Sequence, residues 1–151
     1  MRAWGKILKG DRPSLSIEIT RECPLRCPGC YAYHDSHLGG GETLRSLRDR
    51  KGQELIDGVL EIADRFQPLH LSIVGGDPLV RYRELESLVP QLLDRGIHVQ
   101  IVTSAFRSLP ASWAALDHLN VVAALIMVPI IAREGVNALR GKSCCACCDC
   151  Q

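Results

Sequence analysis

The sequence predicts an α/β fold in which the strands of a parallel sheet alternate with single helices. Four short runs have the apolar, β-branched character of strands, and they lie at residues 15–20, 69–74, 97–102 and 120–126. Two longer segments between them carry apolar residues at helical spacing. Strands joined through one helix each form parallel units with right-handed crossovers. We therefore expect about four parallel βα units, which suits the size of a single domain.

Each long helix is predicted from an apolar stripe. The first is expected at residues 51–66, where one face carries Leu55, Ile56, Val59, Leu60, Ala63 and Phe66. The second is expected at residues 82–95, and Gly96 is well placed to end it. A short third helix is expected to begin at Pro110, because proline suits the first helical position, and to include Trp113.

Three cysteines follow the first predicted strand at Cys-x3-Cys-x2-Cys spacing, namely Cys23, Cys27 and Cys30. Three thiolates on one loop can hold three irons of a [4Fe–4S] cluster and leave the fourth iron open to another ligand. A redox dithiol would use only Cys27 and Cys30. A zinc site would add His34 and His37, but its ligand pairs would lie far closer than the ~12–15 residues of a zinc finger. Both alternatives leave Cys23 without a role.

The cysteine loop and a second motif together resemble the radical S-adenosylmethionine (SAM) superfamily. Residues 75–78, Gly-Gly-Asp-Pro, follow the second predicted strand and look like the family's Gly-Gly-Glu-Pro motif, with aspartate in place of glutamate. The resemblance implies that Cys23, Cys27 and Cys30 hold a [4Fe–4S] cluster whose open iron chelates the amino and carboxylate groups of SAM. An electron from the cluster then splits the sulfonium and gives a 5′-deoxyadenosyl radical. The chain is therefore expected to be a radical SAM enzyme.

The resemblance also implies how the second motif contacts SAM. Gly75 and Gly76 would let the backbone approach SAM closely, and Pro78 would fix the exit from the turn. Asp77 would accept hydrogen bonds from the SAM amino group, and glutamate should be tolerated there because it restores the reach usual in the family. An ordinary glycine-rich turn between a strand and a helix is the alternative for this tetrapeptide.

Two further residues are implied as SAM contacts. Ser104, after the third predicted strand, would touch the methionyl carboxylate or the ribose, although a serine in a turn needs no such role. Tyr31 would flank the adenine or only cover the loop, because Gly29 stands where the family usually has an aromatic residue. Parallel sheets bind ligands beyond the carboxyl ends of their strands. We therefore expect the cysteine loop, the Gly-Gly-Asp-Pro turn and Ser104 to converge.

The resemblance covers residues 14–122, whereas a complete eight-stranded barrel takes ~250 residues. We therefore expect an incomplete TIM-like (β/α) barrel, with an N-terminal extension at 1–13, a partial core at 14–126 and an atypical tail at 127–151. The tail contains five cysteines, which are Cys144, Cys145, Cys147, Cys148 and Cys150. They could bind an auxiliary cluster or scavenge metal. The abrupt change in character near residue 123 favours a shift out of the ancestral reading frame.

Charge and hydropathy narrow the remaining function classes. The formal net charge is +1 with both signs interspersed, so no nucleic-acid partner is expected. The longest apolar run is shorter than the ~17–25 residues of a membrane helix. No signal-peptide core follows the basic N-terminus, so we expect a cytoplasmic protein without a membrane partner. The expected partners are an unidentified small-molecule or peptide substrate and an electron donor such as flavodoxin or ferredoxin. The alternative is a non-catalytic iron–sulfur or metal-binding protein, because a truncated barrel would not shield a radical.

Overall fold

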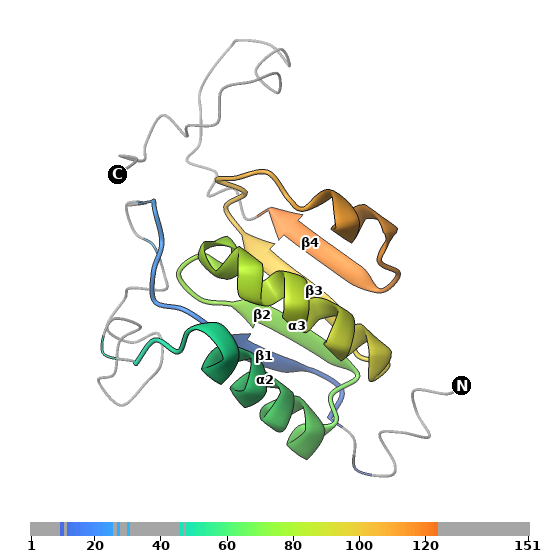
Figure 1. Cartoon of the computed structure of the whole chain (residues 1–151). Coiled ribbons are helices and arrows are strands. Elements are labelled where there is room, and N and C mark those ends of the chain that lie inside the picture. Colours follow the sequence, from blue (N-terminus) through green and yellow to red (C-terminus); the bar gives the residue numbers. More distant parts are fainter. Residues whose placement is uncertain are drawn as a thin grey trace.

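A computed structural model gives the fold and describes residues 10, 12–25, 27, 30, 46 and 48–123 (Figure 1). Four strands form one sheet of order β1-β2-β3-β4, and each neighbouring pair is parallel. The strands are β1 (Leu15–Glu18), β2 (His70–Val74), β3 (His98–Thr103) and β4 (Leu119–Ala123). This arrangement confirms the predicted α/β fold, in which parallel units are added one after another along the chain.

Two long helices connect the first three strands, α2 (Gly52–Phe66) before β2 and α3 (Tyr82–Asp94) before β3. Two short 3-10 helices, η3 (Pro78–Arg81) and η4 (Ala111–Ala115), precede α3 and β4. The sequence predicted all of them except η3, which follows directly on the glycine-rich turn. The helices lie on one face of the sheet (Figure 1), as right-handed crossovers between successive neighbouring strands require. None of the described helices is long and apolar enough to cross a membrane.

The apolar core lies between this face of the sheet and the helices. The buried strand residues are Leu71, Ile73, Val99 and Ile101. The buried helix residues come from the predicted stripes, and they are Leu55, Ile56, Val59, Ala63, Leu85, Leu88, Val89 and Leu92. Full burial of a Leu, Ile or Val side chain contributes about 1.5–3 kcal/mol. This layer therefore fixes the helices on the sheet and, with them, the segments that follow each strand.

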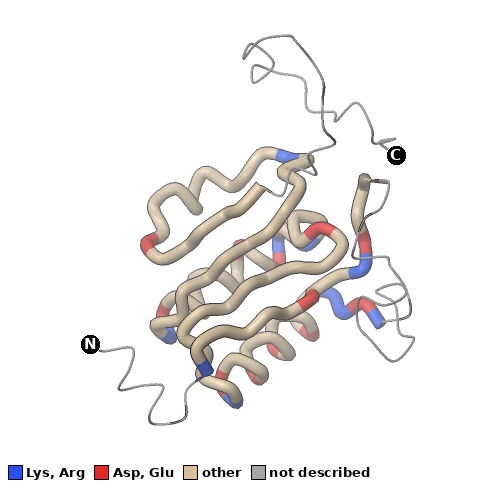
Figure 2. The backbone as a smooth tube through the Cα atoms, turned by 180° about the vertical axis from the view of Figure 1, so that it is seen from behind, with Lys and Arg blue, Asp and Glu red and all other residues tan. Residues whose placement is uncertain are grey.

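The opposite face of the sheet has no described helix over it (Figure 2). The strand register aligns four polar residues in one row across this face, namely Ser16, Ser72, Gln100 and Asn120. Successive side chains of a strand point to opposite faces, so this row points away from the apolar core. The sheet is thus apolar toward the helices and polar in the middle of its open face.

Candidate active site

The segments that follow β1 and β2 are joined at the carboxyl edge of the sheet. The backbone N–H of Gly76 donates to the carbonyl oxygen of Thr20 at 2.7 Å, and the N–H of Asp77 donates to that of Glu22 at 2.9 Å. These two hydrogen bonds extend the β1–β2 pairing beyond the strands, up to the residue before Cys23. The Gly-Gly-Asp-Pro turn therefore holds the start of the cysteine loop.

The two glycines of the turn are required by this backbone contact. Gly75 has φ +144°, a conformation that L side chains rarely adopt, and a Cβ there would lie 2.5 Å from the carbonyl oxygen of Thr20. A Cβ on Gly76 would overlap the carbonyl oxygen of Glu22. The close approach that the sequence assigned to a ligand is thus made to the chain's own backbone. It brings the turn after β2 and the start of the cysteine loop together.

Asp77 links this turn to the end of β3. Its carboxylate is buried, with the residue 1% exposed. One oxygen accepts from the N–H of Leu79 at 3.0 Å and from the hydroxyl of Thr103 at 2.7 Å. The other accepts from the N–H of Ser104 at 2.8 Å and from the hydroxyl of the same serine. Asp77 and Ser104, both predicted site residues, are therefore in direct contact, and buried Pro78 follows as the first residue of η3.

A buried arginine ties the cysteine loop to η3 from a second side. The guanidinium of Arg81, whose side chain is 8% exposed, pairs with Glu22 at 2.9 Å and with Asp49 at 2.8 Å. Among the described residues, its Nε has no hydrogen-bond partner. Lys51 also donates to Glu22, at 2.9 Å. The hydrogen bonds from Arg81 and Lys51 lower the pKa of Glu22 to about 2, so this carboxylate is fully charged at neutral pH.

Asp49 is the second anchor of the same loop. One of its oxygens accepts from the hydroxyl of Thr20 at 3.1 Å, and the other accepts from the N–H of Arg21 at 2.7 Å. Burial alone would lower the pKa of Arg81, but its contacts with Glu22 and Asp49 outweigh burial and raise it. Residues 20–22 are therefore held by backbone hydrogen bonds on one side and by this ion-pair network on the other.

Cys23, Cys27 and Cys30 are half-buried, and none of the three forms a disulfide. The N–H of Cys30 donates to the carbonyl oxygen of Cys27 at 3.2 Å. Among the described residues, no three His, Cys, Asp or Glu side chains lie close enough together to hold a metal ion. The donor set still fits an iron–sulfur cluster, because soft thiolates select such clusters. The assignment of the cysteines as cluster ligands therefore stays a prediction that rests on their chemistry and spacing.

Several residues singled out from the sequence lie outside the described part of the chain. They are Tyr31, His34, His37 and the tail cysteines Cys144, Cys145, Cys147, Cys148 and Cys150. Their expected roles stay predictions.

The sequence did not identify the residues that anchor the loop, which are Glu22, Asp49 and Arg81. Charged residues in short polar segments are usually solvated, so nothing local marks these three as partners. One local signal was present for Arg81. It follows the apolar pair Leu79 and Val80 directly after the Gly-Gly-Asp-Pro turn, where the chain enters the core.

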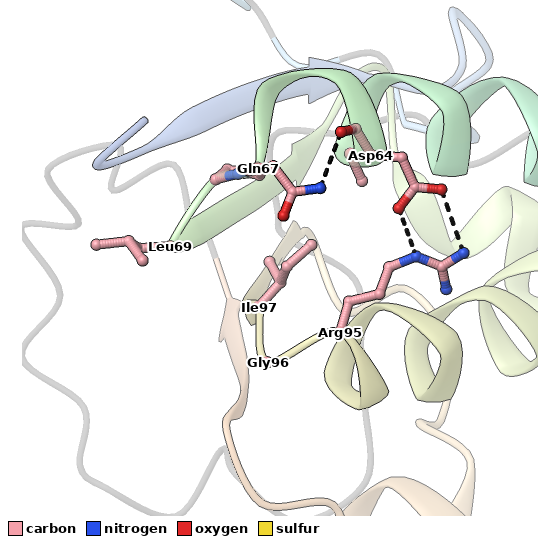
Figure 3. Close-up of a pocket in the computed structure, with 8 residues that line it drawn as sticks. Asp64, Gln67, Leu69, Arg95, Gly96 and Ile97 are labelled. Carbon is pink, nitrogen blue, oxygen red and sulfur yellow. Dashed lines mark hydrogen bonds and ion pairs between the residues drawn. The ribbon is translucent and has the colours of Figure 1, made fainter. Parts of the chain in front are cut away.

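A small pocket lies at the other end of the sheet (Figure 3). Its lining residues come from the end of α2 and from the short connections that lead from α2 to β2 and from α3 to β3, and they include Gln67, Leu69 and Ile97. Arg95 donates to Asp64 at 2.9 Å beside it, and this hydrogen bond lowers the pKa of Asp64. The pocket is therefore at the amino edge of the strands, away from the cysteine loop, and we do not assign it to the active site.

A family model described as the radical SAM superfamily matches residues 17–143. The chain belongs to the radical SAM superfamily. The match continues past the described residues, so the point at which the tail departs from the family stays a prediction. The names of its curated relatives are those of enzymes, in agreement with the expectation that this radical SAM protein is an enzyme.

Three relatives show how far the similarity extends. The chain is 36% identical over 89 residues to the 7-carboxy-7-deazaguanine synthase of Hyperthermus butylicus, which covers 59% of this chain and 34% of the relative. It is 33% identical over 90 residues to the PqqA peptide cyclase of Rhodopseudomonas palustris, covering 59% of this chain and 21% of that enzyme. It is 26% identical over 95 residues to an S-adenosylmethionine-dependent nucleotide dehydratase of Psychrobacter lutiphocae. This match covers 59% of this chain and 31% of that enzyme. The radical SAM protein thus spans about a third or less of these relatives, and no solved structure matches it significantly.

Proposed function

We propose that this radical SAM protein binds a [4Fe–4S] cluster and SAM at the carboxyl edge of its sheet and uses them to activate a substrate. When bound and reduced, the cluster would supply the electron that cleaves SAM reductively to methionine and a 5′-deoxyadenosyl radical. Cys23, Cys27 and Cys30 would hold the cluster. The Gly-Gly-Asp-Pro turn, Ser104 and Tyr31 would form the side of the site that takes SAM.

One observation carries this proposal. The backbone of the Gly-Gly-Asp-Pro turn is hydrogen-bonded to residues 20 and 22, directly before the first cysteine. The two motifs that resemble the family in sequence are therefore held next to each other, which supports the proposal that they form one site. Asp77 extends that site to Ser104 after β3. Three predicted segments from three strands thus meet where parallel sheets bind ligands.

The partners follow from the same chemistry. An electron donor such as flavodoxin or ferredoxin would reduce the cluster, and the protein would work in the cytoplasm. The substrate class stays open between a small molecule and a peptide. Relatives of both kinds support this, since one is named as a deazaguanine synthase and another as a peptide cyclase. Residues that distinguish them would lie largely in the parts of those enzymes that this chain does not match.

The test is anaerobic reconstitution of the full chain with iron and sulfide, followed by reduction in the presence of SAM. We expect iron, sulfide and visible absorbance in the protein, and 5′-deoxyadenosine and methionine in the products. A variant with Cys23, Cys27 and Cys30 all replaced by alanine is the matched control. It should bind no cluster and form no 5′-deoxyadenosine. A cluster without 5′-deoxyadenosine would indicate the alternative, a non-catalytic iron–sulfur protein. The absence of any cluster would refute both.

A further inference from the structure

We propose that Asp77 is a positioning residue, a buried clamp between the turn after β2 and the end of β3, and that its carboxylate does not receive the SAM amino group. This inference rests on the proposed function, because it concerns how the SAM side of that site is built. It departs from what the resemblance to the Gly-Gly-Glu-Pro motif implies for an acidic residue at this position.

The carboxylate of Asp77 has no free acceptor position. An ionised carboxylate offers about four lone-pair sites on its two oxygens. The N–H of Leu79 and the hydroxyl of Thr103 occupy one oxygen, and the N–H and hydroxyl of Ser104 occupy the other. The residue is only 1% exposed. An ammonium group could reach this carboxylate only by displacing donors that would then be left unpaired in a buried place, which is costly.

The short side chain of Asp77 is itself part of this arrangement. Asp77 precedes η3 and accepts from the N–H two residues later, the geometry in which Asp, Asn, Ser and Thr cap helices. A glutamate carries its carboxylate one methylene further from the backbone and is not among the residues favoured as caps. The extra methylene would also have to fit a fully buried site. The structure therefore gives a physical reason for aspartate here, and it predicts that Asp77→Glu weakens the site.

The clamp connects the two halves of the proposed site. On one side, the backbone of residues 76 and 77 holds the start of the cysteine loop through Thr20 and Glu22. On the other, the carboxylate of Asp77 holds Ser104. The distance between the cysteine loop and the end of β3 is therefore set through Asp77. Its loss should let the end of β3 move relative to the loop without removing any group that contacts SAM.

The first test needs no ligand. Hydrogen exchange of backbone amides, measured on the cluster-free full chain, should be faster at both Leu79 and Ser104 in the Asp77→Ala protein. Asp77→Asn keeps one oxygen acceptor and turns the other position into a donor, so it should expose mainly the amide of Ser104. Asp57→Asn, on the exposed face of α2, is the matched control and should change neither amide. Unchanged exchange in both Asp77 variants would overturn the clamp.

The second test separates positioning from direct contact. The affinity of the reconstituted protein is measured for SAM and for an analogue in which hydrogen replaces the α-amino group. Asp77→Ala should weaken both ligands by the same factor, about ten-fold. The electron paramagnetic resonance signal of its reduced cluster should still respond to saturating SAM. Loss of affinity for SAM alone, with the analogue unaffected, would show that Asp77 receives the amino group and would overturn the proposal.

The two tests also distinguish this inference from the proposed function. If the unmodified protein binds no SAM, the proposed function fails, whereas the exchange rates of Leu79 and Ser104 still decide whether Asp77 is a clamp. Ser104→Ala probes the same contact from its other side. The double variant Asp77→Ala with Ser104→Ala should lose no more affinity than Asp77→Ala alone, because both changes remove one shared interaction. Additive losses would indicate two separate contacts with SAM.

Discussion

Replacing Arg81 by methionine should remove the buried cation that joins the cysteine loop to η3. Its two partners differ in burial, since the side chain of Asp49 is 9% exposed and that of Glu22 is 43% exposed. Removal of one partner from a buried ion pair costs about 3–5 kcal/mol, because the other charge is left uncompensated. Removal from an exposed pair costs about 0–1 kcal/mol. The main cost therefore comes from Asp49.

The expected loss is about 3 kcal/mol of unfolding free energy, at the lower end of the range for buried pairs. Asp49 keeps two hydrogen bonds, from the hydroxyl of Thr20 and the N–H of Arg21, and these partly stabilise its charge. Glu22 keeps Lys51 as a partner. Because small domains have a total stability of about 5–15 kcal/mol, a loss of this size is a large fraction of it.

Urea unfolding of the cluster-free full chain, followed by far-ultraviolet circular dichroism, measures this loss. Arg95→Met breaks the exposed pair with Asp64 and is the matched control, which should be much less destabilising. Asp49→Asn combined with Arg81→Met should recover part of the stability, because no buried charge then lacks a partner. The reasoning is refuted if Arg81→Met destabilises the protein no more than Arg95→Met does.

Three further predictions concern the cysteine loop and the sheet edge. Cys27→Ala should abolish the visible absorbance of the reconstituted protein. Alanine at all five tail cysteines should leave this absorbance largely intact; these are Cys144, Cys145, Cys147, Cys148 and Cys150. Retained iron in the Cys27→Ala protein would contradict the cluster assignment. Gly76→Ala should lower both the urea midpoint of unfolding and the iron content of the reconstituted protein, because the added Cβ would overlap the carbonyl oxygen of Glu22. An unchanged iron content would show that cluster binding does not depend on this contact. Val122, exposed on β4, lies on a strand that pairs on one side only among the described residues. We expect the unmodified protein to self-associate through this exposed edge, and Val122→Lys should reduce that self-association in light scattering. If the unmodified protein is already a monodisperse monomer, the edge does not cause association.

The regular elements were predictable because they depend on local patterns. The third predicted strand, residues 97–102, differs by one residue at each end from β3 (His98–Thr103). The helix predicted at residues 51–66 is α2 (Gly52–Phe66), whose buried residues Leu55, Ile56 and Val59 belong to the expected stripe. Periods of two and of 3.6 residues are properties of the neighbouring sequence alone. The fold class followed from how these elements alternate.

The contacts that organise the site were not predictable in the same way. Arg81 and Asp49 are far apart in sequence, and neither residue's neighbours mark the other as a partner. The glycines at 75 and 76 were correctly singled out, but their backbone contacts come from the residues after β1, which no local pattern reveals. Asp77 was identified as an important acid, whereas three of its four donors, from Thr103 and Ser104, appear only when β3 is placed beside β2. Pairing across the sheet, and not the motif itself, defines the surroundings of each residue.

The anchors of the cysteine loop also imply an order of maturation. The contacts from Asp49, Gly76, Asp77 and Arg81 that hold residues 20–22 all come from the segment that ends with Arg81, which includes the end of the first βαβ unit. The clamp on Asp77 needs Thr103 and Ser104, which are synthesised later. Chains emerge from the ribosome at about 5–20 residues per second, and their N-terminal parts fold first. We therefore expect residues 20–22, directly before Cys23, to be anchored in a nascent chain before the end of β3 is in place to complete the clamp on Asp77.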